Sequence, residues 1–160
     1  MTLRVGIGRD RHGFGPGSPL ILGGIEFPGA PRLVGHSDGD VVLHAVADAL
    51  LGAAGLGDLG RLFPQDARTP AGIASGRLLE AVVERVAEAG YRIGSVDVTI
   101  EGARPRLGDR LMAIRDAIAA LLTVDVDAVS VKASTGNLIG AEGGGRAISA
   151  EAVAILQTER

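Results

Sequence analysis

Cysteine and tryptophan are absent from this 160-residue sequence, and other aromatic residues are few, with three Phe and one Tyr. Without Cys the chain forms no disulfide and no thiolate metal site, so any metal must be held by His, Asp or Glu. The formal net charge is −3. A general nucleic-acid binder presents a basic face and often stacks bases on aromatic rings, so we expect no nucleic-acid partner.

Long apolar runs are also missing. The nearest candidate, VVLHAVADALLGAAGLG, is interrupted by His44 and Asp48, so we expect no membrane span. The N-terminal residues MTLRVGIGRD are typical of a strand, with no visible signal or transit peptide. With 46% hydrophobic and 22% charged residues, the composition predicts one folded cytoplasmic domain over residues 1–160.

The order of hydrophobic patterns predicts strands mixed with helices. Strands are expected over residues 3–8, 92–102, 128–134 and 146–156, with a hairpin around Gly23-Gly24, and helices over 38–54, 75–89 and 107–122. The last strand pattern is also compatible with a helix, but a fourth strand would complete a sheet. We therefore predict an α/β (α+β) fold, one mainly four-stranded mixed sheet with helices on one face. The other face would be fairly apolar and buried by self-association.

The first expected helix has a start signal. Ser37 followed by Asp40 resembles a capping box, which makes Ser37 the expected N-cap, and Gly55 or Gly57 is a plausible stop. His36 and Ser37 would then stand beside free backbone N–H groups, which favour phosphate. The alternative is a capped helix and nothing more. The Gly-rich stretch 134–146 is a weaker phosphate candidate.

Three residues form a candidate metal site. Asp10 and His12 are two positions apart, so on an extended chain they face the same side, and His44 lies near the middle of the first helix. Two imidazoles and one carboxylate, with an open fourth position, are typical of catalytic zinc. Asp40 and Asp48, each four residues from His44, are candidates to orient its ring. The alternative is a surface turn and an ordinary helix histidine.

The motifs resemble a known family closely, in order and spacing, over nearly the whole chain. They are Asp10-Arg11-His12, the block GHSDGDVVLHAVADALLGAAGLGDLGRLFP over 35–64, VDVTI over 96–100 and VKAST over 131–135. They are similar to the 2-C-methyl-D-erythritol 2,4-cyclodiphosphate synthases, lyases of non-mevalonate isoprenoid synthesis. The resemblance implies a homotrimer whose sheets pack around its axis, with active sites between subunits. It also implies cyclisation of 4-diphosphocytidyl-2-C-methyl-D-erythritol 2-phosphate with release of CMP.

The resemblance also assigns roles to residues of this chain. It implies zinc on Asp10, His12 and His44, and catalytic roles for His36 and Thr135. Further positions would bind substrate, those from 102 to 108 being donated by the neighbouring subunit: Ser37, Asp58, Leu59, Gly60, Phe63, Pro64, Gln65, Asp66, Ala67, Gly102, Ala103, Arg104, Pro105, Arg106, Leu107, Gly108, Ser134, Gly136 and Asn137.

The sequence departs from the family pattern at several of these positions. Asn137 stands where a glutamate usually binds Mg²⁺ or Mn²⁺, and its neutral amide predicts a weakened second metal site. The loop FPQDA has fewer acids than the usual FPDTDP, and Arg106 replaces a usual lysine. Near the C-terminus GGGRA replaces GRGEG, so Arg146 would bring the positive charge of an axial cavity that can hold isoprenoid diphosphates. Arg11 replaces a small apolar residue.

A working cyclase is therefore the leading prediction. The alternatives are a zinc phosphohydrolase that releases linear products, a non-catalytic trimer that binds isoprenoid diphosphates through Arg146, and a structural trimer without metal. The cyclase ranks above them because its expected residues are present together: Asp10, His12, His36, His44, Asp58 and Thr135.

Overall fold

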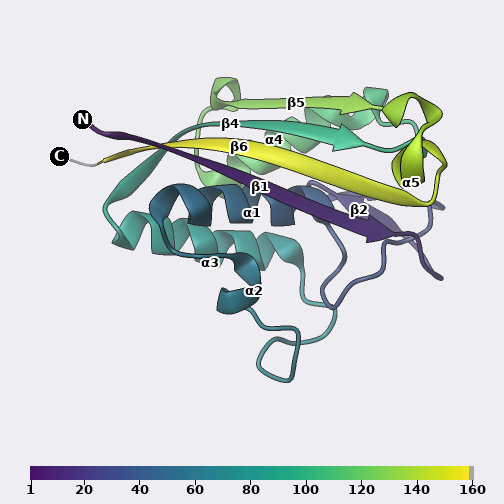
Figure 1. Ribbon diagram of the computed structural model, residues 1–160, viewed down its shortest axis with the longest axis horizontal. Coiled ribbons are helices and arrows are strands. Elements are labelled where there is room, and N and C mark those ends of the chain that lie inside the picture. Colours follow the sequence, from purple (N-terminus) through teal and green to yellow (C-terminus); the bar gives the residue numbers. More distant parts are fainter. Residues whose placement is uncertain (159–160) are drawn as a thin grey trace.

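A four-stranded sheet spans the molecule in this computed structural model, which describes residues 1–158. Its strands lie in the order β1 (Leu3–Gly13), β6 (Ala147–Thr158), β4 (Tyr91–Glu101) and β5 (Val129–Ser134) (Figure 1). The first two pairings are antiparallel and β4 pairs with β5 in parallel. The predicted mixed sheet is confirmed, and the C-terminal segment is a strand. The hairpin also forms, from β2 (Leu20–Leu22) and β3 (Ile25–Phe27).

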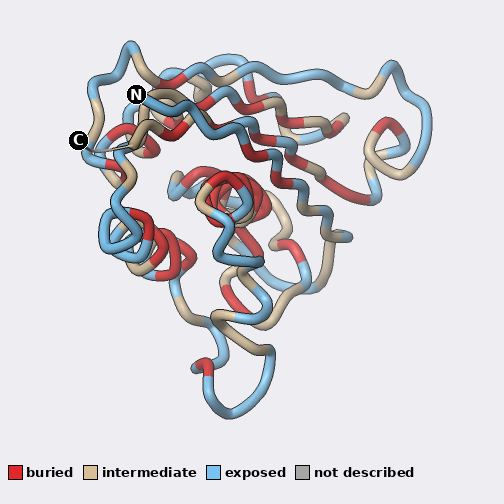
Figure 2. Tube along the Cα trace, turned by 60° about the vertical axis from the view of Figure 1, so that its left-hand side comes forward, coloured by how far each residue is buried: buried red, intermediate tan, exposed pale blue. Residues whose placement is uncertain are grey.

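The long helices lie on one face of this sheet, as expected: α1 (Val41–Ala54), α3 (Ser75–Glu88) and α4 (Leu111–Leu122) (Figure 1). Figure 2 shows α1 buried on nearly every side, which explains its almost wholly apolar sequence. Shorter turns complete the chain: α2 (Leu59–Leu62), α5 (Gly140–Gly143) and 3₁₀ turns over Gly108–Arg110, Val126–Ala128 and Gly136–Leu138. None of the helices within residues 1–158 combines the length and apolar character needed to cross a bilayer.

Two glycines let α1 lie directly against β1. A Cβ atom built on Gly8 would stand 2.0 Å from the carbonyl oxygen of Ala45, and one on Gly6 would stand 2.0 Å from that of Ala49. Neither position has room for any side chain, so the strand and helix backbones touch. Since His44 precedes Ala45 on the helix, this contact brings it beside the strand.

Within residues 1–158 the opposite face of the sheet carries none of the long helices, and its character changes along β1. Leu3, Val5 and Ile7 are each more than half exposed at one end of the strand. At the other end, Arg9 pairs with Glu151 at 2.5 Å and Arg11 with Glu142 at 2.8 Å. The face is therefore apolar over only part of its length.

The structure corrects several predicted boundaries. Asp40 and not Ser37 is the N-cap of α1, so the helix begins at Val41 and not at residue 38. The helix expected from 107 begins at Leu111, because an Arg110 N–H to Leu107 carbonyl bond closes a 3₁₀ turn first. The strand expected to end at Gly8 continues to Gly13, since its pairing with β6 runs that far. The predicted stop of α1 at Gly55 is confirmed: this glycine is the C-cap, in a left-handed conformation with φ of 74°.

Replacing Asp40 with Ala should lower the free energy of unfolding by about 2–3 kcal/mol. The fully buried carboxylate accepts hydrogen bonds from the N–H groups of Val42 and Leu43, and also from those of Gly23 and Gly24 in the hairpin turn. The substitution leaves donors of two elements without an acceptor. Urea unfolding followed by circular dichroism measures the loss.

Asp125 provides the matched control, because it is an exposed N-cap whose side chain makes no capping bond. Asp125→Ala should change stability by less than about 0.5 kcal/mol. Equal losses in the two variants would contradict the role given to Asp40.

Candidate metal centre and active-site pocket

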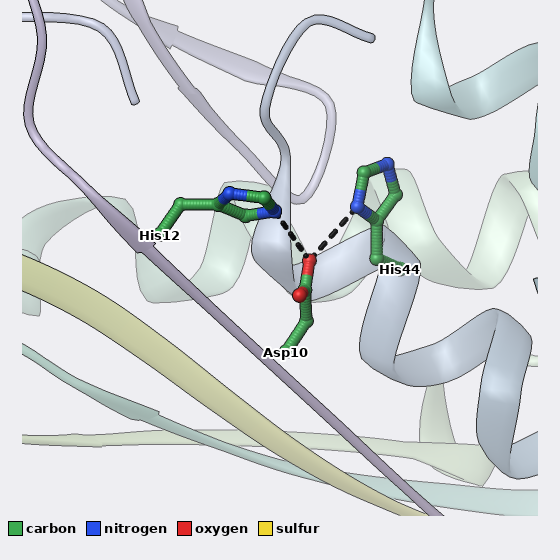
Figure 3. A group of neighbouring side chains, drawn as sticks. All are labelled: Asp10, His12 and His44. Carbon is green, nitrogen blue, oxygen red and sulfur yellow. Dashed lines mark hydrogen bonds and ion pairs between the residues drawn. The ribbon is translucent and has the colours of Figure 1, made fainter. Parts of the chain in front are cut away.

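Asp10, His12 and His44 come together where β1 crosses α1. Asp10 and His12 lie on the inner face of the strand, and Figure 3 shows both histidines pointing at the same carboxylate oxygen. Asp10 Oδ2 is 3.1 Å from His12 Nε2 and 2.8 Å from His44 Nδ1. The expectation that these three residues converge is therefore met.

The donor set fits a transition-metal ion. One donor atom from each residue lies within 4.8 Å of the others. Ligands of a tetrahedral zinc ion, at about 2.0–2.1 Å from the metal, stand about 3.3 Å apart. The two distances from Asp10 Oδ2 to the imidazole nitrogens, 3.1 and 2.8 Å, are slightly shorter than this. One carboxylate and two imidazoles leave a fourth position for a substrate oxygen.

The electrostatics of the cluster favour a cation at its centre. Burial alone raises the pKa of the Asp10 carboxyl, but hydrogen bonds from His12 and His44 outweigh it and hold that pKa well below its usual range. The hydrogen bond to Asp10 raises the pKa of His12, against the lowering effect of burial. The carboxylate thus stays charged and attracts a positive group, whether a proton or a metal ion.

Metal affinity should rise with pH because metal and proton compete for His12. The pKa of His12 lies above its ordinary value of about 6.5, so below that raised pKa each pH unit lost should weaken zinc binding about tenfold. Competition with a chromogenic chelator between pH 6 and 8.5 measures this dependence. A flat affinity across that range would contradict it.

Two serines, and not the predicted acids Asp40 and Asp48, hydrogen-bond to the second ring nitrogen of His44. His44 Nε2 lies 3.0 Å from Ser37 Oγ and 2.9 Å from Ser75 Oγ. Asp40 is occupied with capping and the hairpin, and Asp48 accepts from the N–H of Leu59. The i±4 spacing does place these acids on the histidine's helix, but their carboxylates have closer backbone donors. No local signal in the sequence identifies Ser75, which reaches the site from α3.

The start of α1 does not offer His36 and Ser37 the free N–H groups that were expected to favour phosphate. The helix begins four residues after Ser37, and the N–H groups of Val42 and Leu43 already donate to Asp40. Because that carboxylate is buried and negative, it occupies the position that an anion would take. The Gly-rich stretch forms only short helical turns, with Asn137 in a left-handed conformation at φ 53°.

A pocket of about 170 Å³ adjoins the metal cluster. It is lined by the three clustered residues, by the expected catalytic residue His36 and by several expected substrate positions: Ser37, Leu59, Gly60, Phe63 and Gln65. His36 Nε2 lies 2.6 Å from the carbonyl oxygen of Thr69, which holds the ring at the pocket wall. Thr69 also lines the pocket, and the sequence offered no signal for it.

Other expected residues line a different pocket, of about 240 Å³. It contains Thr135 together with Gly102, Ala103, Pro105, Arg106, Leu107, Gly108 and Ser134. The remaining predicted positions line neither pocket: Asp58, Pro64, Asp66, Ala67, Arg104, Gly136, Asn137 and Arg146. Asp58 caps α2, Asp66 pairs with Arg68, and Arg104 lies over the ring of Phe14. One chain therefore does not bring His36 and Thr135 into one pocket.

A third pocket, of about 520 Å³, lies on the face of the sheet opposite the long helices. Its charged lining residues are Arg9, Asp10, Arg11, Glu101, Glu142 and Glu151, and Arg146 is not among them. Charges of both signs line it, and two ion pairs lie there: Arg9–Glu151 joins β1 to β6, and Arg11–Glu142 joins β1 to α5.

Comparison with known proteins gives the same assignment as the sequence motifs. A family model described as the YgbB family matches residues 3–157, and the chain belongs to that family. A 2-C-methyl-D-erythritol 2,4-cyclodiphosphate synthase of Gemmatimonas aurantiaca is 48% identical over 140 residues, covering 88% of this chain and 84% of that protein. One of Erwinia tasmaniensis is 46% identical over 154 residues, covering 96% and 98%.

Solved structures agree with the fold. The bifunctional IspDF of Campylobacter jejuni superposes with a TM-score of 0.94 at 34% identity, over 99% of this chain and 43% of that longer chain. An IspF–CDP complex of Plasmodium falciparum gives 0.85 at 29% identity, over 99% and 97%. The expectation of an enzyme of isoprenoid precursor synthesis with this α+β fold is confirmed.

Proposed function

We propose that the protein cyclises 4-diphosphocytidyl-2-C-methyl-D-erythritol 2-phosphate to 2-C-methyl-D-erythritol 2,4-cyclodiphosphate and releases CMP. The observation that carries this proposal is the Asp10, His12 and His44 cluster beside His36 in one pocket of a family member. The CDP complex of the similar Plasmodium falciparum protein supports a cytidine nucleotide as part of the substrate.

The reaction moves one phosphorus–oxygen bond. An oxygen of the 2-phosphate attacks the β-phosphorus, and the bond from that phosphorus to the oxygen bridging to the α-phosphate breaks. CMP leaves with the bridging oxygen. The attacking phosphate is already anionic, so the site needs positioning and charge neutralisation and no general base.

Each residue of the site has a definite task in this reaction. Asp10, His12 and His44 would hold zinc, which supplies Lewis-acid polarisation of phosphate oxygens and a template for their approach. His36 is positioned by the Thr69 carbonyl through Nε2. This bond fixes the His36 ring in the pocket that adjoins the cluster.

A homotrimer would complete the site. Thr135 and the residues of 102–108 other than Arg104 line a pocket separate from that of His36, so a second chain is required if both sets act on one substrate. The face of the sheet opposite the long helices, with Leu3, Val5 and Ile7 exposed, would be covered in such an assembly. Ion pairs such as Arg11–Glu142 would then lie near its axis, with Arg146 as an added positive charge. The cytoplasmic location stays a prediction.

The decisive experiment supplies the diphosphocytidyl substrate with Zn²⁺ and Mg²⁺ and follows the products by phosphorus NMR. The proposal expects the paired signals of a cyclic diphosphate together with one equivalent of CMP. Linear phosphates in their place would identify a phosphohydrolase, and unchanged substrate with folded, zinc-loaded protein would refute catalysis.

The second metal should bind more tightly when Asn137 is replaced by Glu. A carboxylate adds the charge that the amide lacks, so the Mg²⁺ or Mn²⁺ concentration for half-maximal activity should fall about tenfold. The backbone of Asn137 is left-handed, with φ of 53°, and Asn tolerates this conformation better than Glu does. Strain in the Glu variant therefore reduces part of the gain in metal affinity. Asn137→Asp separates the two effects, because it adds charge and tolerates that backbone. An unchanged metal requirement in both variants would exclude position 137 as a ligand.

A further inference from the structure

Behind the metal cluster, a chain of hydrogen bonds leads from His44 to a carboxylate on a neighbouring loop. Its members are Ser75, the first residue of α3, and Asp38, in the loop before α1. We propose that Asp38, acting through the Ser75 hydroxyl, positions the His44 imidazole for metal binding. This inference rests on the metal site of the proposed function, and it assigns roles to two residues outside the ligand set.

The geometry gives each hydrogen bond one direction. His44 Nδ1 faces Asp10 and the metal position, so the ring's hydrogen resides on Nε2 when a metal is bound. Ser75 Oγ stands 2.9 Å from Nε2, and it also contacts Asp38 Oδ1. An ionised carboxylate only accepts, so the Ser75 hydroxyl donates to Asp38 and its lone pairs receive the Nε2 hydrogen.

Asp38 is itself held in place. Its Oδ2 accepts from the Ser75 N–H at 3.0 Å and its Oδ1 from the Asp40 N–H at 3.1 Å. Its own N–H donates to the carbonyl oxygen of Ile73 at 3.1 Å. The carboxylate therefore joins the start of α3 to the loop before α1.

The hydroxyl groups that contact His44 Nε2 are buried, so their hydrogen bonds can influence metal binding. Ser75 is 1% exposed and Ser37 is 6% exposed, so water does not easily replace either hydroxyl. Ser37 Oγ, at 3.0 Å from Nε2, offers a second acceptor; it lies 3.4 Å from Ser75 Oγ and accepts from the Gly39 N–H. A hydrogen bond from a metal-bound imidazole to a group backed by negative charge fixes the ring and strengthens it as a ligand.

Zinc affinity of purified full-length variants tests the proposal, measured by chelator competition together with the thermal stability of the metal-free protein. Ser75→Ala and Asp38→Asn should each weaken zinc binding about tenfold. This is the lower end of the range of losses for groups that hydrogen-bond to a metal ligand, because Ser37 remains as a second acceptor. The double variant should lose little more than either single one, since both act through the same chain. The Co²⁺ absorption spectrum should shift in all three. Ser130→Ala, an exposed serine on β5, should change nothing.

Several results would overturn the proposal. Unchanged zinc affinity in Ser75→Ala and Asp38→Asn would do so, including the case where only the stability of the metal-free protein falls. Fully additive losses in the double variant would show that the two residues do not act through one chain. A wild-type protein without zinc binding would refute the metal site as well, so the two failures are distinguishable.

Discussion

Asp10→Ala should empty the metal site and lower the rate of CMP release by about 10³-fold or more. Asp10 supplies the only carboxylate of the cluster, and both histidines point at its Oδ2. Without it, the two remaining residues of the cluster are imidazoles, and neither supplies a negative charge to offset the cation. Mass spectrometry after dialysis measures the loss of zinc, and an assay of CMP release measures the loss of activity.

Arg11→Ala is the matched control for this experiment. The residue is the direct neighbour of Asp10, but its side chain lies on the other face of the strand and pairs with Glu142. We expect wild-type zinc content in this variant. Retention of full zinc occupancy in both Asp10→Ala and His12→Ala would refute the metal site.

Gly8→Ala should lower the free energy of unfolding by about 4 kcal/mol, beyond the usual range for overpacking. The added Cβ would stand 2.0 Å from the Ala45 carbonyl oxygen and 2.6 Å from the Ala49 nitrogen, and these backbone atoms cannot turn aside. Strand and helix would have to separate by about 1 Å, whereas a working site tolerates about 0.5 Å. Zinc affinity should therefore fall along with stability.

Gly52→Ala provides the comparison on the facing helix. A Cβ there meets nothing nearer than the carbonyl oxygen of Ile7 at 4.0 Å, so the substitution should stabilise the protein by about 0.5–1 kcal/mol. Denaturant unfolding and zinc titration measure both variants. Wild-type stability and zinc affinity in Gly8→Ala would contradict the close contact of β1 with α1.

Much of the fold could be predicted because it depends on local patterns. Alternation along β4, with Val96, Val98 and Ile100 buried, and the helical repeat of α3 are visible within short windows. The start of α1 was predicted wrongly because Ser37 and Asp40 both suit an N-cap, and the choice depends on the hairpin. The N–H groups of Gly23 and Gly24 hold Asp40 at that position, and they are remote in sequence.

By itself, the sequence determined the three clustered residues and the family. The spacing of Asp10 and His12 on an extended chain places both on one face, and the motif block around His44 identifies their partner. Only the tertiary structure decided what supports this cluster. The contact of Gly8 with α1, the hydroxyl of Ser75 behind His44 and the separate pocket of Thr135 all join residues far apart along the chain. Such contacts depend on how the elements pack, and no short-range pattern encodes that packing.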